Sequence, residues 1–404
     1  MFQQFKNLYH LFQAILANLY YGFPSRKLKV IGVTGTDGKT TTTHLIYYIL
    51  KSNGKKVSMI SSVYAQVGEK EFDTGFHVTT PDVFPLQKLL LQSVQNGDEY
   101  FVLETTSHAL FQNRVFGIRY EIGVLTNVTH EHLDMHHTLE EYTRIKLKLL
   151  QRAKYAVTNE DDQSYKQIKD QRSKIKDADR KSKIFTYSLR HPELVSGSDF
   201  KKQMLKRVQN DMAEFNQYNY LAAYKVCKIL GLSDEEILSA MRTFKLPKGR
   251  YEVISTKPVT AIIDFAHTPN GIYEILKDVR KRYVKKGNKL IHVFGSAGKR
   301  DQTKRSSMGE ASGAFSDFVI LTEEDYRDED PIKICNEIAI GLKKKGKPYS
   351  IIVDRKKAIK KAFEIAQKGD VVIATGKGHE TSLCRGDKEY PWDERKVFYD
   401  NLRS

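Results

Sequence analysis

Two hydrophobic patterns alternate along the first half of the chain. Short runs of consecutive apolar residues predict buried strands, and the segments between them repeat apolar residues every three or four positions, as helices do. The strands predicted in this way are 28–33, 56–60, 100–104, 122–127 and 156–159. Strands that alternate with helices favour a parallel α/β sheet.

The same alternation restarts after a segment with the composition of a hinge, Leu246 to Arg250. The predicted strands beyond it are 260–264, 290–294, 318–321, 350–353 and 370–374. We therefore predict an N-terminal helical segment and two α/β domains. The limits that we expect for them are 1–28, 29–248 and 249–404.

The first 24 residues place large apolar side chains at helical spacing. These residues are Phe2, Phe5, Leu8, Phe12, Ile15, Leu16 and Leu19. One interpretation is an amphipathic helix on a membrane surface or a partner, and the other is a helix that packs on the first domain. We favour the packed helix, because the polar side of this segment is not strongly basic.

The interval 160–214 differs from its surroundings. It is highly charged over 163–183, rich in turn formers over 191–198, and basic over 201–212. It shows no clear strand pattern, so we predict an atypical surface insertion. The run from 191 to 212 has the character of a translated repetitive sequence.

The amino-acid composition argues against several classes of protein. The chain has 404 residues, of which 40% are hydrophobic and 28% charged, and a formal net charge of +17. The longest lysine run is only 343–345, which indicates a lysine-rich surface rather than a nucleic-acid groove. Three cysteines without a C-x-x-C pair argue against disulfides and a zinc site. We find no signal peptide or membrane-spanning run, and we expect a cytoplasmic protein.

A glycine loop stands between the first predicted strand and the helix after it. Gly32, Gly35 and Gly38 allow a tight turn whose N–H groups approach an anion, and the following helix adds its positive dipole end. Lys39 supplies a charge for phosphates, and Thr40 supplies a hydroxyl for Mg²⁺. The spacing is G-x-x-G-x-x-G-K-T rather than the standard phosphate-binding motif. A glycine-rich turn with a chance Lys-Thr pair is the alternative.

Polar residues follow several other predicted strands. Glu104 ends one strand, and 130–137 holds four histidines and two acids after the next. That cluster alone is a weak indication of zinc. The second domain carries polar runs at 264–270, 295–301 and 375–380. Because parallel sheets bind ligands at the carboxyl ends of their strands, these runs favour a ligase or kinase that closes on its substrate.

Together and in this order, these motifs resemble the Mur ligase family of ATP-dependent amide ligases. The MurE type, which adds the third amino acid to UDP-N-acetylmuramoyl-L-alanyl-D-glutamate, is the most similar. The resemblance runs from about residue 25 to the end, apart from 160–214. It implies a central P-loop-type ATPase domain with a mostly parallel sheet, a C-terminal Rossmann-like domain, and a role in peptidoglycan precursor synthesis in which ATP and Mg²⁺ take part.

The resemblance also assigns residues. Lys39, Glu104, His132 and Lys146 match catalytic positions, with Thr40, Glu104 and His132 as magnesium ligands and Lys146 as a carbamylated lysine. ATP contacts match Gly35, Thr36, Asp37, Gly38, Lys39, Thr40, Thr41, Asn216, Asn219, Arg250, Asp264, His267 and Asn270. Contacts to the muramoyl-peptide match Thr79, Thr80, Thr106, Gln112 and Arg114, and contacts to the incoming amino acid match Arg300, Arg327, Gly376 and Glu380.

The sequence departs from the family in three places. We find no N-terminal uridine-nucleotide domain, which leaves open whether the acceptor carries UDP, and the interval 160–214 is atypical. The D-N-P-R motif of diaminopimelate enzymes stands here as Glu324-Asp325-Tyr326-Arg327. Arg327 can grip a second carboxylate, so we lean to diaminopimelate over lysine. We favour a monomer. The alternatives are a folylpolyglutamate synthetase-like ligase and a degenerate, non-catalytic Mur-like binding protein.

Overall fold

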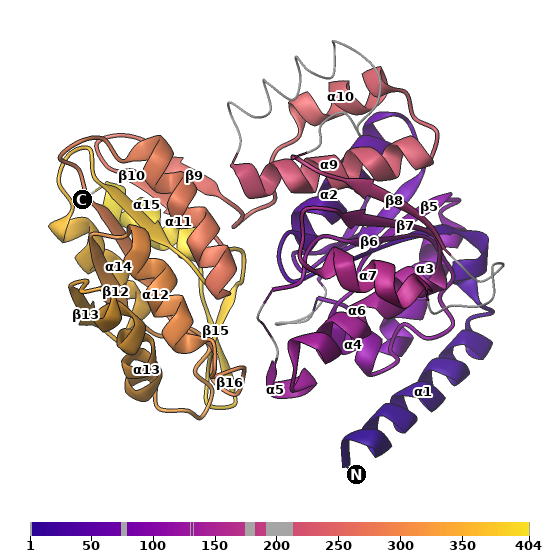
Figure 1. Cartoon of the computed structure of the whole chain (residues 1–404), viewed down its shortest axis with the longest axis horizontal. Coiled ribbons are helices and arrows are strands. Elements are labelled where there is room, and N and C mark those ends of the chain that lie inside the picture. The colour runs from indigo at the N-terminus through magenta and orange to yellow at the C-terminus, as the bar shows by residue number, and fades with distance from the viewer. Residues whose placement is uncertain are drawn as a thin grey trace. The chain divides into compact units, whose positions relative to one another are not determined.

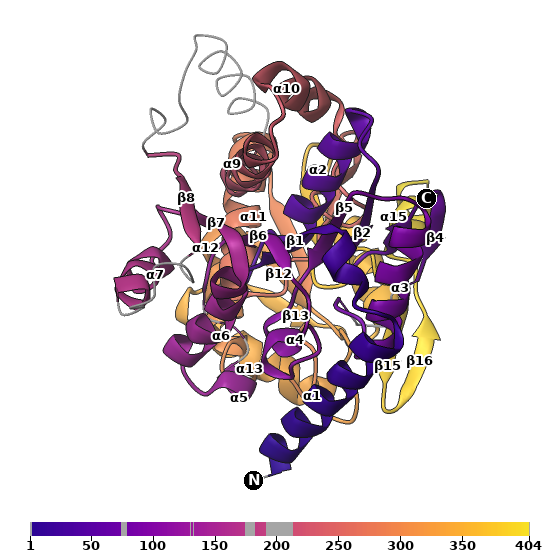
Figure 2. The same ribbon diagram turned by 90° about the vertical axis from the view of Figure 1, so that its right-hand side faces the viewer.

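A computed structural model describes residues 2–73, 79–129, 131, 133–173, 182–190 and 213–403. The chain forms two compact units. Unit 1 comprises Met1–Thr129 and Glu140–Lys245, and unit 2 comprises His130–Leu139 and Leu246–Ser404. Figures 1 and 2 show the elements of both units.

Unit 1 is built on one sheet with the strand order β4-β3-β2-β5-β1-β6-β7-β8 in the described part of the chain. The six strands in the order β2-β5-β1-β6-β7-β8 run parallel to one another, whereas β3 pairs antiparallel with both β2 and β4 at one edge. Their bounds are β1 Lys29–Thr34, β2 Val57–Ile60, β3 Ala65–Val67, β4 Lys70–Phe72, β5 Tyr100–Glu104, β6 Tyr120–Leu125, β7 Ala153–Asn159 and β8 Lys183–Tyr187.

Helices cover both faces of this sheet. Successive residues of β1 point to opposite faces of the sheet. Val30 therefore joins one apolar cluster, while Ile31 and Val33 join the other. Helices α2, α9 and α10 supply the cluster of Ile31, and α3, α4 and α6 supply that of Val30. The helices of unit 1 are α1 Phe2–Tyr20, η1 Pro24–Lys27, α2 Lys39–Ser52, α3 Val83–Gln95, α4 Ser107–Phe111, α6 Leu139–Arg152, α7 Ser164–Ser173, α9 Glu214–Ile229 and α10 Asp234–Thr243.

Unit 2 has a smaller sheet with the order β13-β12-β11-β14-β10-β9, in which only β9 runs antiparallel to its neighbour among the described strands. A separate hairpin joins β15 to β16. The elements are α5 Leu133–His136, β9 Glu252–Ser255, β10 Thr260–Ile263, α11 Pro269–Tyr283, β11 Leu290–Phe294, α12 Arg305–Phe315, β12 Phe318–Leu321, α13 Pro331–Lys344, β13 Tyr349–Ile351, α14 Arg355–Ile365, β14 Val371–Ala374, β15 Ser382–Arg385, β16 Lys388–Pro391 and α15 Glu394–Leu402.

The α/β fold class with a mostly parallel sheet and a second α/β domain is confirmed. The expected absence of a strand in 160–214 is wrong, because β8 lies there and pairs with β7 at the sheet edge. Its pattern is weak because an edge strand buries little: of its five residues only Tyr187 is fully buried. The stretch 191–212 lies outside the described residues, and the predicted domain limits remain predictions.

Candidate active site

The glycine loop follows β1 and leads directly into α2. Gly35 and Gly38 have φ values of 151° and 81°. A Cβ at Gly35 would lie 1.8 Å from Thr126 Oγ1, and one at Gly38 would lie 2.2 Å from Asn219 Oδ1. Both positions therefore require glycine for their backbone conformation and for the close approach of neighbouring side chains.

Residues after β6 hold this loop in place. Asp37 N donates to Asn127 Oδ1 at 2.9 Å, and Asp37 O accepts from Thr126 Oγ1 at 2.7 Å. Thr36 Oγ1 accepts from Thr129 N at 3.0 Å. The loop between strand and helix is thus fixed through its backbone before any ligand binds.

The first turn of α2 carries the predicted phosphate-binding residues. Lys39 is its first residue, and Lys39 Nζ donates to Thr36 O at 2.8 Å, so the ammonium group lies over the loop. Thr40 and Thr41 are buried, and no acid occupies this turn. The exposed N–H groups of a helix start and a lysine on the same side attract an anion.

Glu104 meets Thr40 at the carboxyl end of β5. Thr40 Oγ1 donates to Glu104 Oε1 at 3.0 Å, and Glu104 Oε2 accepts from Ser62 N at 2.9 Å. The hydroxyls of Thr40 and Ser62 lie 2.9 Å apart. The resulting cluster of hydroxyl and carboxylate oxygens is the donor set that Mg²⁺ prefers.

Lys146 comes from α6 and reaches the other side of the loop. Its side chain is buried, its Nζ donates to Gly35 O at 2.6 Å, and it lies 4.3 Å from the centre of the Tyr142 ring. The structure therefore brings Lys146 to the glycine loop, as a role in the site requires.

Three of the five predicted acceptor contacts form one group beside Glu104. Thr80 Oγ1 donates to Glu104 O at 2.9 Å and accepts from Thr106 N at 3.1 Å. Arg114 Nη1 donates to Thr80 O at 2.7 Å. Gln112 ends α4 and is half-buried, and Thr79 is also half-buried.

Asn216 and Asn219 approach the loop from α9. Asn219 Nδ2 donates to Asn216 Oδ1 at 3.1 Å, and Thr42 Oγ1 of α2 lies 3.4 Å from Asn219 Oδ1. Two of the predicted ATP residues, distant in sequence, are therefore neighbours of the glycine loop.

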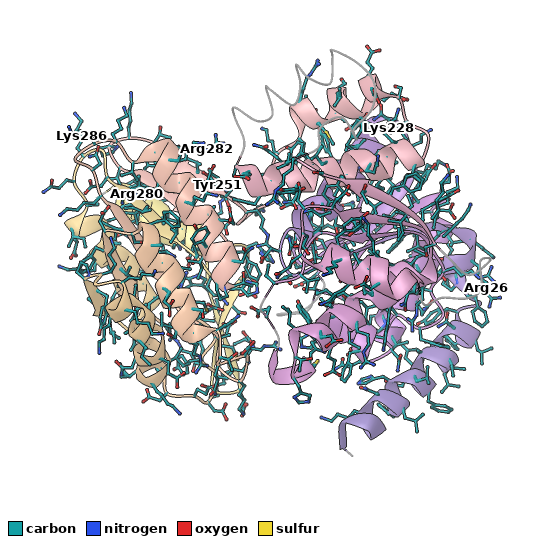
Figure 3. The ribbon with its side chains drawn as sticks, in the orientation of Figure 1. Arg26, Lys228, Tyr251, Arg280, Arg282 and Lys286 are labelled. Carbon is teal, nitrogen blue, oxygen red and sulfur yellow. The ribbon has the colours of Figure 1, made fainter. Side chains whose placement is uncertain are left out.

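In unit 2, Asp264 organises the segment that follows the hinge. Its two oxygens accept from Tyr251 N and Ala266 N, each at 2.7 Å. Tyr251 has a φ of 46°, and its hydroxyl donates to Asp278, which pairs with Arg282 at 2.8 Å (Figure 3). This network fixes the backbone at Tyr251 and thereby the position of the preceding residue, Arg250.

Arg250 lies on an aromatic cluster. Its guanidinium carbon is 4.2 Å from the centre of the Phe265 ring, which in turn contacts the rings of His267 and His379 at 4.8 and 4.9 Å. Asn270 is the second residue of α11, directly beyond this cluster. Such a group offers stacking and cationic contacts to a flat heterocycle.

Two of the four predicted amino-acid contacts, Glu380 and Gly376, adjoin Lys377. Its Nζ lies 2.8 Å from Asp325 Oδ1 and 2.5 Å from Glu380 Oε2, while Arg327 Nη1 donates to Gly298 O at 2.6 Å. A Cβ at Gly376 would lie 2.6 Å from Glu324 Oε2. Arg300 is half-buried in the loop between β11 and α12.

Glu324 is a buried carboxyl in this group. Burial raises its pKa to about 7, and the neighbouring Asp325 carboxylate acts in the same direction. Its Oε2 atom has no hydrogen-bond partner among the residues that the structure describes. A carboxyl of this kind accepts a hydrogen-bond donor or a cation readily.

One residue of the metal prediction has no place in the described structure. His132 lies outside the described residues. Among the residues that are described, no group of three His, Cys, Asp or Glu side chains could hold a metal. The described residues do not test the zinc interpretation of the histidine run, and the oxygen cluster at Thr40 is the candidate cation site.

Sequence reasoning missed several partners. Ser62, Asn127 and Tyr142 contact the glycine loop or its threonine, and Phe265 and Lys377 each centre a cluster in unit 2. Phe265 and Lys377 stand inside runs that follow predicted strands, so their position was a usable signal. Ser62 follows a strand too, but nothing local distinguishes it.

Comparisons with known proteins agree with this geometry. Residues 33–227 match the Mur ligase middle domain, and residues 249–378 match the Mur ligase glutamate ligase domain. The UDP-N-acetylmuramoyl-L-alanyl-D-glutamate–2,6-diaminopimelate ligase of Caldanaerobacter subterraneus is 37% identical over 396 residues, which cover 96% of this chain and 81% of that protein.

Solved structures place the fold in the same group. A structure of a UDP-N-acetylmuramoyl-L-alanyl-D-glutamate–2,6-diaminopimelate ligase matches 93% of this chain and 78% of its own with 29% identity and a TM-score of 0.56. A Mycobacterium tuberculosis folylpolyglutamate synthase matches 91% and 92% with a TM-score of 0.69, but at 14% identity it shows the fold alone. With its two matching domains and its 37% identity to a diaminopimelate ligase, the chain belongs to the Mur ligase family.

Proposed function

We propose that this chain is an ATP-dependent ligase that joins an amino acid to the carboxylate of a muramoyl-peptide in peptidoglycan precursor synthesis. The observation that carries the proposal is the contact between Thr40 and Glu104 on a glycine loop held by backbone hydrogen bonds. A relative named for this reaction is 37% identical over nearly the whole chain, which supports the same substrate class.

The reaction has two steps. A carboxylate oxygen of the acceptor attacks the γ-phosphorus of ATP, giving an acyl phosphate and ADP. The amine of the amino acid then attacks the acyl carbon, the C–N bond forms, the nitrogen releases a proton, and inorganic phosphate leaves with the C–O bond electrons. Lys39 and the N–H groups of the first turn of α2 stabilise the charge on the phosphoryl oxygens.

The oxygen cluster suits a magnesium ion. Thr40 and Glu104 offer a hydroxyl and a carboxylate, and Ser62 offers a second hydroxyl close by. Hard cations prefer such oxygen ligands and keep several waters or phosphate oxygens. When bound, Mg²⁺ supplies positive charge to the phosphates.

For Lys146 we propose carbamylation. The Lys146 ammonium loses one proton, its nitrogen then adds CO₂, and a second proton is released from that nitrogen, which turns a cation into an anion. A carbamate keeps one N–H, so the hydrogen bond to Gly35 O can persist while two new oxygens face the loop. The buried position supports this role, because a carbamate there would place an anion at the glycine loop.

The muramoyl-peptide would contact the group of Thr79, Thr80, Thr106, Gln112 and Arg114. The adenosine would contact Asn216, Asn219, Arg250, Asp264, His267 and Asn270. For the amino acid we propose diaminopimelate, with Arg327 taking its second carboxylate and Gly376, Glu380 and Arg300 contacting the rest. Phosphate chemistry with ATP and three buried thiols fit a cytoplasmic enzyme.

A phosphate-release assay tests the proposal directly. Purified protein with ATP and Mg²⁺ is offered muramoyl-L-alanyl-D-glutamate with and without UDP, or folate derivatives, each with diaminopimelate, lysine or glutamate. We expect release only with a muramoyl acceptor and most with diaminopimelate. Release that needs a folate would favour the folylpolyglutamate synthetase alternative, and no release with any pair would favour a binding protein.

A further inference from the structure

Helix α1 attaches to unit 1 through a narrow face of small residues. Ala14, Ala17 and Asn18 are buried there, and the first two pack with Val83 of α3. Asn18 Nδ2 donates to Phe116 O at 3.0 Å. Small side chains let α1 approach α3 closely, so this contact buries only small apolar residues of α1, Ala14 and Ala17.

The large apolar residues of α1 point the other way. We call this set the α1 apolar face; its exposed fractions range from 41% to 77%, and it consists of Leu8, Tyr9, Phe12, Ile15, Leu16, Leu19 and Tyr20. At about 100° per residue, the seven positions fall within an arc of about 140°. They are seven of the fifteen large exposed apolar side chains in the described part of the chain.

This arrangement reverses the usual surface helix, whose large apolar residues face the protein. Figures 1 and 2 show α1 at the margin of unit 1, with its N-terminal end pointing away from the sheet. An exposed hydrophobic patch of this size is typical of a surface that binds a protein or a membrane.

The charged side chains on α1, η1 and α3 are all positive, and the acid that precedes α3, Asp82, pairs with Arg114 at 3.3 Å. Helices α1, η1 and α3 contain Lys6, Arg26, Lys27 and Lys88 and no acidic residue. All four side chains are exposed, and Figure 3 marks Arg26 beside the C-terminal end of α1. The whole chain carries a net charge of +17.

We propose that α1 binds the surface of an anionic lipid bilayer, with the α1 apolar face in the interface and the four cations against lipid headgroups. Helices of this type lie in the plane of the membrane, and tyrosines such as Tyr9 and Tyr20 favour its boundary. No helix in the described part is long and apolar enough to cross a bilayer, so the attachment is peripheral.

A second copy of the chain fits this surface less well. A two-fold contact through α1 would bring lysines and arginines onto the same cations of the partner copy, with no acid on these elements to face them. Like charges in such a contact oppose association, whereas an anionic bilayer is attracted by all four.

Vesicle flotation tests the proposal with the full chain. Vesicles of phosphatidylcholine alone are compared with vesicles that also contain phosphatidylglycerol. We expect binding to the anionic vesicles, a decrease of about tenfold or more in the bound fraction for Phe12→Ser/Leu16→Ser/Leu19→Ser, and a smaller decrease for Lys6→Gln/Arg26→Gln/Lys27→Gln/Lys88→Gln. The control Ile332→Ser/Ile340→Ser removes similarly exposed residues from α13 and should bind as the wild type does.

Thermal unfolding and phosphate release establish that each variant is folded, because none of these residues contacts the candidate active site. Equal binding to neutral and anionic vesicles, or unchanged binding of the serine variant, would overturn the proposal. So would a wild-type dimer in light scattering that the serine variant abolishes without any vesicle binding, because the occupant would then be a second copy.

Discussion

The glycine loop of unit 1 and the Lys377 cluster of unit 2 hold their functional side chains by different means. In the loop, the partners are mostly backbone atoms: Asp37 N, Gly35 O and Thr36 O all take part. Around Lys377, two of its partners are the carboxylates of Asp325 and Glu380. One site is fixed by chain geometry, and the other by mutual compensation of charges.

The difference matters for mutation. Removing a side chain that the loop or the first turn of α2 itself carries leaves the loop's shape intact, so the loss should appear in chemistry alone. Removing one charge from a buried cluster leaves its partners uncompensated, so stability and binding should change together. Four substitutions test this contrast, in order of decreasing expected effect.

Lys39→Ala should have the largest effect. The ammonium over the loop is lost, and we expect kcat for phosphate release to fall by about 10³-fold with little change in thermal midpoint. The matched control Lys55→Ala removes an exposed lysine from the turn after α2 and should retain full activity. Undiminished release from folded Lys39→Ala protein would remove the ATP-loop assignment.

Lys146→Ala should follow, with a loss of about 10²-fold or more in kcat. Short carboxylates such as acetate should restore part of the rate if a carbamate is the working form, and Lys154→Ala provides an exposed-lysine control. The lost donor to Gly35 O should also lower the free energy of unfolding by about 1–3 kcal/mol. An enzyme without Lys146 that turns over at the wild-type rate would rule out the role.

Arg327→Ala addresses the amino-acid site. Its loss should lower kcat/KM for diaminopimelate about 10- to 100-fold, because a bidentate contact to a carboxylate disappears, while lysine should be affected much less. Lys299→Ala removes a neighbouring exposed cation as a control. A wild-type preference for lysine, or an unaltered preference in the variant, would exclude Arg327 from selectivity.

Glu324→Gln should have the smallest effect on activity and a distinct effect on stability. A pKa raised from 4.5 to about 7 means that the folded protein holds a proton that the unfolded chain releases between these pH values. Stability contributed by this group is therefore present below pH 4.5 and is lost as pH rises to about 7, by about 3 kcal/mol.

Urea unfolding at several pH values measures this loss. The difference in unfolding free energy between wild type and Glu324→Gln should shift in favour of the variant as pH increases through this range. Glu364→Gln, which changes an exposed carboxyl of α14, should show no such trend. A parallel pH dependence in wild type and Glu324→Gln would mean that folding does not raise the pKa of this carboxyl.

The features that could be predicted from the sequence are those that depend on consecutive residues. The strands 100–104, 290–294 and 318–321 are predicted residue for residue because they lie inside their sheets and are buried, apart from the half-buried Phe318, and because all their residues except Glu104 and His292 are apolar. The loop from Gly35 to Thr40 was predicted because its chemistry depends on consecutive residues. Edge strand β8 was not, since burial on one side leaves a weak pattern.

Long-range partners were beyond local pattern. Ser62 reaches Glu104 across 42 positions, and Lys377 reaches Asp325 across 52. The direction of the α1 apolar face is a further case: helical spacing indicated one apolar stripe facing the domain, whereas the packing uses Ala14 and Ala17. The small residues Ala14 and Ala17 are less conspicuous in the sequence than the large apolar residues, but they make the contact with α3.

The contact of Asn219 with Gly38 and Thr42 has a consequence for biosynthesis. Thr42 and Asn219, which are 177 positions apart, must meet before Asn219 can pack against the glycine loop at Gly38. During translation, the ribosome releases the glycine loop long before α9, so an early nascent chain carries the phosphate-binding residues without the helix that encloses them. Nucleotide capture thus becomes a late event in folding, available only after the segment that follows residue 212 has joined the sheet of unit 1.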